Sequence, residues 1–238
     1  MWNETVLQQL LLITDGCSNA GTDPVYVAQL ARSKGIATSV IGILDEGSLG
    51  ETGRREAQNI AEAGGGMCRI VKASELSKTM QMVTRQTMQL TLHHVVNSEL
   101  RQLMGQDSDH LPPETRTKVA SLVETMTEEV WMDLGLVIDV SASMNHKMTA
   151  VREATRDLEF GLNARSGSHR LTVITYPGTN GSLADVHHSI AAEGIADFIG
   201  AIRPTGNTPT GPALEIAMKA LLNRESDDAP GSMRHYVV

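Results

Sequence analysis

The sequence has few cysteines and no pair of them at a spacing that holds a metal. Its two cysteines, Cys17 and Cys68, form no Cys-x-x-Cys motif, and neither has a histidine partner at zinc-site spacing. A cysteine zinc site is therefore not supported. We expect two buried, free thiols in a reducing compartment.

Basic residues are also fewer than acidic ones. The 238-residue chain has 20 Lys and Arg against 28 Asp and Glu, a formal net charge of -8, and no basic cluster. This balance argues against a general nucleic-acid binder. The N-terminus lacks the basic segment and cleavage-like site of a secretory signal, and its apolar run at residues 10–13 is too short to cross a bilayer. We therefore expect a cytoplasmic protein that binds neither nucleic acid nor membranes.

Apolar residues, by contrast, are frequent, and they fall into short segments that alternate between strand and helix patterns. Strands alternating with helices predict an α/β fold with a mostly parallel central sheet flanked by helices. The short turn at residues 177–181 favours an antiparallel hairpin, so the strand after it is expected at a sheet edge. The predicted strands are residues 7–14, 36–44, 67–71, 131–138, 169–176, 183–190 and 234–238, and the predicted helices are residues 24–34, 51–63, 146–164, 194–202 and 212–222.

The middle of the chain has a different pattern. Residues 74–103 contain no glycine or proline, which predicts a helix roughly 45 Å long. Pro112-Pro113 then begins a second helix, to about residue 126. We interpret this pair as a bridge between two half-domains, residues 1–78 and 131–238, with the bridge at 79–130. A partner-docking arm is the alternative.

Three separate segments carry oxygen ligands at places where strands end. The strand at 131–138 runs into Asp139, followed by Ser141 and Ser143, whose side chains alternate along an extended loop and so point the same way. The strand at 7–14 stops at Asp15, and Thr208 precedes a helix. Carboxylate and hydroxyl oxygens suit Mg²⁺ or Mn²⁺. Because ligands bind beyond the carboxyl ends of strands in open α/β sheets, we expect the two aspartates to meet there.

These pieces together resemble the von Willebrand factor A (vWA) family, whose metal site is called MIDAS. The family's Asp-x-Ser-x-Ser pattern falls on Asp139, Ser141 and Ser143, its loop threonine on Thr208, and its strand-end Thr-Asp-Gly on Asp15. In the family the Thr-Asp-Gly strand comes last, whereas here it comes first. The order implies one circularly permuted, Rossmann-like vWA domain. Residues 234–238 compete with residues 7–14 for this strand's place, and we assign it to 7–14, which is longer and ends at Asp15.

The resemblance implies a non-enzymatic module that binds a partner's Asp or Glu through a Mg²⁺ or Mn²⁺ ion. The layout is also similar to small cytoplasmic vWA proteins of spore-forming Firmicutes, which implies a role in sporulation-related signalling. One alternative is an accessory subunit of a chelatase or AAA+ ATPase assembly. A homodimer, or an exchange of halves between two chains, is a further expectation for a permuted domain.

Catalytic and other metal sites have weaker support. Ser141 and Ser143 suggest a serine hydrolase, but neither lies in Gly-x-Ser-x-Gly, and His146 is a neighbour only in sequence. The pairs His93-His94 and His187-His188 lack the i, i+4 spacing of a helical zinc site. Thr210 is expected to cap the following helix. Gly64-Gly65-Gly66 is expected to end a helix and not to form a phosphate loop, because a strand rather than a helix follows it.

Overall fold

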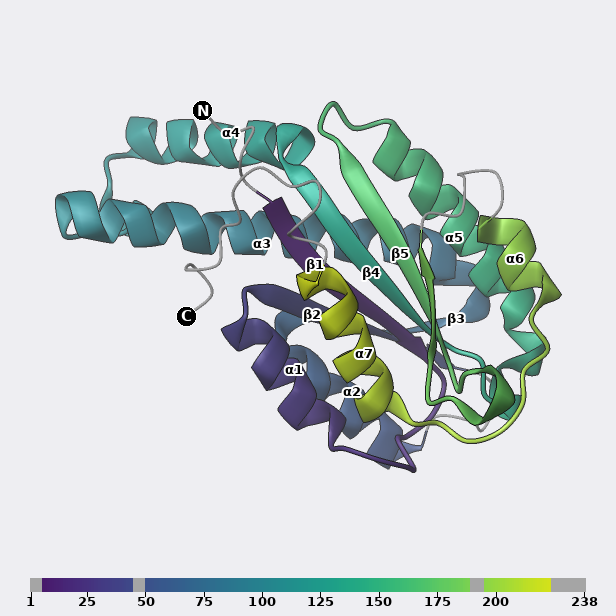
Figure 1. The fold of residues 1–238 in the computed structure, drawn as a ribbon. Helices are drawn as coiled ribbons and strands as arrows, with labels where there is room; N and C mark the ends of the chain where they lie inside the picture. Colours follow the sequence, from purple (N-terminus) through teal and green to yellow (C-terminus); the bar gives the residue numbers. More distant parts are fainter. Residues whose placement is uncertain (1–5, 45–49, 189–194, 224–238) are drawn as a thin grey trace.

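One sheet joins all the strands in the described part of the chain. The computed structural model describes residues 6–44, 50–188 and 195–223 (Figure 1). In this part of the chain, six strands form a sheet in the order β3-β2-β1-β4-β5-β6. All neighbours are parallel except β5 and β6, which are antiparallel, so the predicted mostly parallel α/β sheet and its antiparallel edge are confirmed. The strands are β1 (Val6–Thr14), β2 (Ile36–Leu44), β3 (Gly65–Lys72), β4 (Trp131–Asp139), β5 (His169–Tyr176) and β6 (Asp185–His188).

Helices cover both faces of this sheet. Side chains of α1, α2 and α7 pack in one apolar core, and those of α3, α4, α5 and α6 pack in another on the opposite face (Figure 1). The strands supply both cores by alternation, since Leu11 and Ile13 of β1 join one and Leu10 and Leu12 join the other. The helices are α1 (Pro24–Ser33), α2 (Glu51–Ala63), α3 (Leu76–Met104), α4 (Pro113–Glu129), α5 (Met148–Asn163), α6 (Ile195–Ala201) and α7 (Thr210–Leu222).

The centre of the sheet joins segments from far apart in the sequence. β1 pairs with β4 in parallel from Val6, opposite Trp131, to Ile13, opposite Ile138. Every residue of β1 is buried, as expected for a parallel strand covered on both faces. Because the two strands run in register, Asp139 at the end of β4 and Asp15 just after β1 reach the same edge of the sheet.

The predicted helical pair forms an arm that continues past the sheet (Figure 1). The 29 residues of α3 span about 44 Å. Its first half buries Met80, Val83 and Met88 against the sheet, whereas Leu103 and Met104 at its far end are exposed. Gly105, with φ +70°, ends the helix in the left-handed conformation that glycine adopts easily.

Several boundaries differ from the sequence prediction for local reasons. Only Gly64 ends α2, while the next two glycines begin β3. A side chain at Gly66 would lie 2.2 Å from the Thr38 carbonyl oxygen of β2, so this strand start requires glycine. The helix predicted from residue 146 begins with a 3₁₀ turn, η3 (Ala142–His146), and becomes α5 at Met148. The predicted strand 234–238 and residues 189–190 of the predicted edge strand lie outside the described residues.

The two cysteines are more accessible than the sequence analysis predicted. Cys17 and Cys68 are free, as predicted, but each is only partly buried, because Cys17 lies in a loop and Cys68 on the edge strand β3. Burial raises the pKa of both thiols.

No helix in the described ranges combines the length and the hydropathy needed to cross a bilayer.

Candidate metal centre

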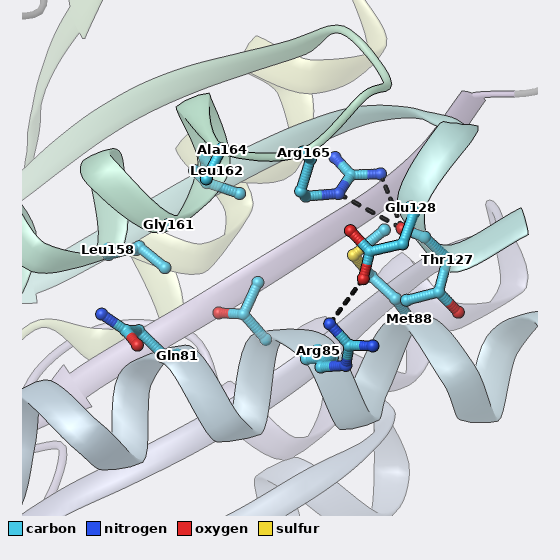
Figure 2. A pocket seen from close by; sticks show the side chains of 11 residues that line it. Gln81, Arg85, Met88, Thr127, Glu128, Leu158, Gly161, Leu162, Ala164 and Arg165 are labelled. Carbon is cyan, nitrogen blue, oxygen red and sulfur yellow. Dashed lines mark hydrogen bonds and ion pairs between the residues drawn. The ribbon is translucent and has the colours of Figure 1, made fainter. Parts of the chain in front are cut away.

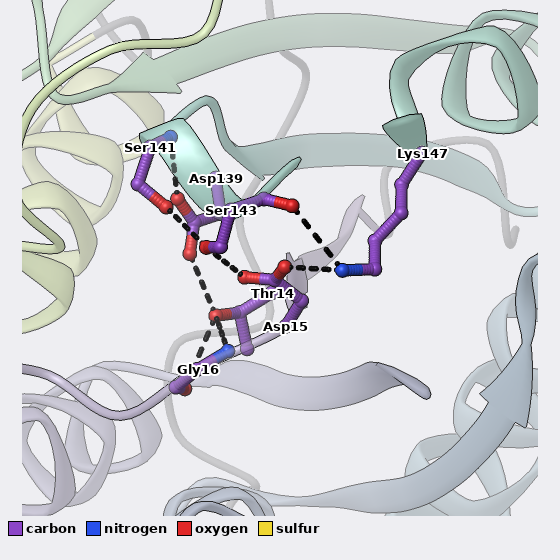
Figure 3. A network of polar contacts seen from close by, with 7 residues as sticks. All are labelled: Thr14, Asp15, Gly16, Asp139, Ser141, Ser143 and Lys147. Atoms are coloured by element: carbon purple, nitrogen blue, oxygen red, sulfur yellow. Dashed lines mark hydrogen bonds and ion pairs between the residues drawn. The ribbon is translucent and has the colours of Figure 1, made fainter. Parts of the chain in front are cut away.

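Asp139 lies at the middle of the site and is fully buried. Its two carboxylate oxygens accept hydrogen bonds from the backbone N–H of Ser141 and from the hydroxyl of Thr14, each over 2.8 Å (Figure 3). Burial raises the pKa of Asp139 to about 6; hydrogen bonds from Ser141 and Thr14 lower it, and the charge of Asp15 raises it further. Both of these donors are neutral groups, so the charge of Asp139 is only partly compensated.

Asp15 lies beside the two serines. The hydroxyl of Ser143 donates to Oδ1 of Asp15 over 2.7 Å, and the hydroxyls of Ser141 and Ser143 are 3.2 Å apart. The 3₁₀ turn η3 folds Ser143 back toward β1, which is why these residues converge (Figure 3). Asp15 and Ser141 are buried, whereas Ser143 is exposed. The network is therefore open to solvent on the Ser143 side.

Thr208 lies in a loop that packs against both halves of the site. Its backbone N–H donates to the Asn19 side chain over 2.9 Å, and its carbonyl accepts from the Asn19 N–H over 3.1 Å. Three residues earlier, the Thr205 N–H donates to the carbonyl of Val140, the residue after Asp139. Thr208 is buried, but within the described ranges no hydrogen bond joins its hydroxyl to either aspartate. The structure thus brings four of the five predicted residues into one network and the fifth onto an adjoining loop.

Thr210 has a different place from the one predicted. It is the first residue of α7 rather than a side-chain cap, and its hydroxyl is buried without a hydrogen-bond partner in the described part of the chain. The prediction was wrong because Pro212 lies in the first turn of the helix, where a missing N–H is tolerated, so the helix begins before it. The fully buried hydroxyl of Tyr176 is unpartnered in the same way.

Tyr176 is opposite Asp139 in the sheet. Burial, then the charge of Asp139, raises the pKa of its phenol well above the usual value. The hydroxyls of Thr14 and Thr210 lie near enough to lower that pKa, yet no hydrogen bond of ordinary geometry reaches the phenol. Nothing in the local sequence signals that Tyr176 lies beside Asp139, because this position depends on strand pairing.

Lys147 also belongs to this network, and the sequence analysis did not predict it. Its ammonium donates to Oδ2 of Asp15 over 2.6 Å and to the carbonyl of Ser143 over 3.2 Å (Figure 3). The side chain is 3% exposed and that of Asp15 is 0% exposed. The available signal was the position of Lys147 four residues after Ser143, in a turn that leads into a helix.

Within the described residues, no group of three or more His, Cys, Asp or Glu side chains could hold a metal ion. A cavity of about 250 Å³ lies between α3, α4 and α5, where Arg85 pairs with Glu128 (Figure 2). Arg165, on its border, donates to the carbonyls of Thr127 and Val130 and so stabilises the end of α4.

The fold and the site define an α/β protein with a polar centre at the carboxyl ends of its two middle strands. The chain is 39% identical over 218 residues to the uncharacterized protein YabS of Bacillus subtilis, covering 90% of this chain and 89% of that protein. It therefore belongs to the family of YabS. No family model matches the chain.

Solved structures extend this comparison. A crystal structure of an uncharacterized protein from Alicyclobacillus acidocaldarius is 44% identical, with a TM-score of 0.88, and covers 93% of this chain and 96% of that one. Proximal thread matrix protein 1 of the mussel byssus, in a structure with a zinc-occupied MIDAS motif, is 16% identical, with a TM-score of 0.32 over 92% of this chain and 48% of that one. A likeness at that level carries no argument about this chain.

Proposed function

We propose that this protein is a metal-dependent protein-binding module of the vWA type, with its halves circularly permuted. The observation that carries the proposal is the bond between the two halves of the chain, from Ser143 to Asp15 over 2.7 Å. A permuted domain requires the N-terminal strand to lie beside the strand that ends at Asp139, and the pairing of β1 with β4 supports this requirement. The role is binding rather than catalysis.

The donor set fits a hard divalent cation. Two carboxylates and two hydroxyls belong to one network, those of Asp15, Asp139, Ser141 and Ser143, which Asp139 joins through the Ser141 N–H. Asp139 is fully buried with neutral hydrogen-bond donors, and its raised pKa reflects that burial. A buried carboxylate is stabilised by a cation that coordinates it. Mg²⁺ or Mn²⁺ fits these oxygens better than a softer metal does.

The residues of this centre would then have different roles. Asp139, Ser141, Ser143, Thr208 and Asp15 would hold the ion. When bound, the ion supplies a coordination position that a partner's Asp or Glu side chain can take. Ser143, the exposed member, lies on the side from which that carboxylate would approach. The buried Asp139 and Asp15 orient their oxygens through hydrogen bonds formed before any partner arrives.

Serine hydrolysis is disfavoured by the contacts of the two serines. The Ser143 hydroxyl donates to a carboxylate, and Ser141 pairs with Ser143. Among the described residues, no hydrogen bond connects His146 to either hydroxyl, whereas an activated serine needs a base within reach. The sporulation role, the ATPase assembly and the exchange of halves between chains stay predictions.

Calorimetric titration with Mg²⁺ tests the metal. We expect the wild type to bind one ion and Asp139→Ala to bind none, because the substitution removes the central carboxylate. Asp109→Ala is the matched control, since it removes an exposed carboxylate from the arm. Equal Mg²⁺ affinity in wild type and Asp139→Ala would refute the proposed site.

Partner binding is tested separately by affinity capture from native lysate. The wild type should retain a specific protein only in the presence of Mg²⁺, and EDTA or Asp139→Ala should release it. Substituting Asp and Glu residues on the captured partner should then locate one carboxylate that binding requires. A partner held equally well in EDTA would show that the interaction does not use the metal.

A further inference from the structure

Three neighbouring strands place polar side chains on the face of the sheet that α7 covers. These are Thr14 at the end of β1, Asp139 at the end of β4 and Tyr176 at the end of β5. Each follows by two residues an apolar residue of the core that contains α7, and alternate side chains of a strand share a face. Tyr176 pairs with Asp139 in the sheet, and the Thr14 hydroxyl donates to Asp139 over 2.8 Å (Figure 3). The carboxylate at the middle of the metal centre therefore has a threonine on one side and a tyrosine on the other.

Two hydroxyls beside this carboxylate have no hydrogen-bond partner in the described part of the chain. One belongs to Tyr176, which is 0% exposed, and the other to Thr210, which is 1% exposed and begins α7. Burial and the charge of Asp139 raise the pKa of the phenol, whereas the nearby hydroxyls of Thr210 and Thr14 lower it. An unpaired buried hydroxyl destabilises a fold, so two of them at one place require an explanation.

The hydroxyl protons of this group can form a single chain of hydrogen bonds. A hydroxyl donates one proton and accepts through two lone pairs. Because Thr14 donates its proton to Asp139, its oxygen can accept from Tyr176, whose oxygen can in turn accept from Thr210. Small rotations of these side chains would complete the chain, which ends on the Asp139 carboxylate. Hydrogen bonds that end on a charged group are strong, and each bond in such a chain polarises the next.

We propose that Tyr176 is a positioning residue of the metal centre, whose hydroxyl, together with that of Thr210, holds Asp139 in the orientation that binds a cation. This inference rests on the proposed function. The two hydroxyls are unpaired in the metal-free fold and become paired when a cation holds the carboxylate in place. They therefore destabilise the metal-free protein and stabilise the metal-bound one.

A packing role for Tyr176 predicts a different pair of results. If the phenol only fills space in the core, Tyr176→Phe leaves Mg²⁺ binding as it was. If its hydroxyl positions Asp139, the substitution weakens Mg²⁺ binding, since partners of a metal ligand tune its affinity. The same substitution then makes the metal-free protein more stable, because an unpaired buried group has been removed. Opposite effects on stability and on metal binding thus identify the positioning role.

The experiment combines thermal melting in EDTA with calorimetric titration with MgCl₂, for the wild type, Tyr176→Phe, Thr210→Val and the double variant. We expect each variant to melt about 2 to 4 °C above the wild type in EDTA and to bind Mg²⁺ about tenfold more weakly. The double variant should bind Mg²⁺ as Tyr176→Phe does, since one missing hydroxyl already breaks the chain. Thr210→Ser, which keeps a hydroxyl, should bind like the wild type. Tyr26→Phe is the matched control, because it removes the hydroxyl of an exposed tyrosine on α1.

The results separate this inference from the proposed function. Unchanged Mg²⁺ binding in Tyr176→Phe overturns the inference and leaves the proposed function intact. A melting temperature of Tyr176→Phe below that of the wild type in EDTA also overturns it, because the hydroxyl then has a partner in the metal-free protein. A wild type that binds no Mg²⁺ refutes the proposed function, and this inference with it.

Discussion

Replacing Asp139 by asparagine removes the central buried charge of the site while keeping its shape. The remaining oxygen still accepts from the Ser141 N–H, and the new amide takes the place of the oxygen now 2.8 Å from the Thr14 hydroxyl. That hydroxyl accepts from the amide and donates to the Gly16 carbonyl, 3.3 Å away. The substitution therefore leaves the hydrogen bonds satisfied and isolates the effect of the charge.

The pKa of Asp139 gives the magnitude. Its value rises from an ordinary 3.8 to about 6 in the folded protein. Since one pKa unit corresponds to about 1.4 kcal/mol, the ionised side chain costs the metal-free fold about 3 kcal/mol at pH 7. We expect Asp139→Asn to raise the free energy of unfolding in EDTA by about that amount. The melting temperature should rise by roughly 5 to 10 °C.

The sign of the pH dependence follows from the raised pKa. Above pH 6 the folded wild type must hold an ionised, buried carboxylate, so the cost is fully present. As the pH falls from 6 to 3.8, the folded state takes up the proton before the unfolded state does, and the cost disappears. The stability gap between Asp139→Asn and wild type should therefore be largest at pH 7 and close to zero below pH 4.

Denaturant unfolding in EDTA at several pH values, and again with Mg²⁺ at pH 7, measures both effects. Mg²⁺ should stabilise the wild type and leave Asp139→Asn unchanged, because a ligand that binds only the native state adds to its stability. The reasoning is wrong if Asp139→Asn is less stable than wild type in EDTA at pH 7. It is also wrong if the gap does not change with pH.

Two further predictions concern the packing of α7 and an ion pair between β4 and β5. Gly211→Ala should destabilise the fold by about 1 to 3 kcal/mol, because its new Cβ would lie 1.7 Å from the Thr22 carbonyl oxygen. Gly16→Ala is the control: its new Cβ would meet nothing within 4 Å, so its melting temperature should stay close to that of the wild type. Arg170→Ala should cost about 3 to 5 kcal/mol, since the fully buried Asp133 loses bonds of 2.5 and 3.0 Å. Adding Asp133→Asn should recover part of that loss, and an unchanged double variant would count against the charge explanation.

The strands and helices were predictable because they depend on residues that are neighbours in the sequence. β1, β2, β4 and β5 were predicted to within one or two residues from apolar runs that stop at polar or glycine residues. The misplaced ends have local causes. Gly65 and Gly66 begin β3 because only glycine fits against β2 there, and η3 precedes α5 because the serine loop turns before the helix starts.

The candidate site was predictable in part. Asp15, Asp139, Ser141 and Ser143 were selected by residue type and by position at strand ends, and the structure brings them into one hydrogen-bonded network. Their role as metal ligands, with that of Thr208, stays a prediction. Lys147 and Tyr176 were missed, because a lysine at a helix start and a tyrosine in a strand have no distinctive pattern.

Sequence by itself determined which segments are strands and helices, and that two apolar strands end in aspartates, because both depend on residues adjacent in the chain. Only the tertiary structure decided that β1 lies beside β4, and that Lys147 is buried against Asp15. Strand neighbours and the burial of a charge are set by packing between segments more than a hundred residues apart. The contacts that make up this centre are therefore a property of the fold.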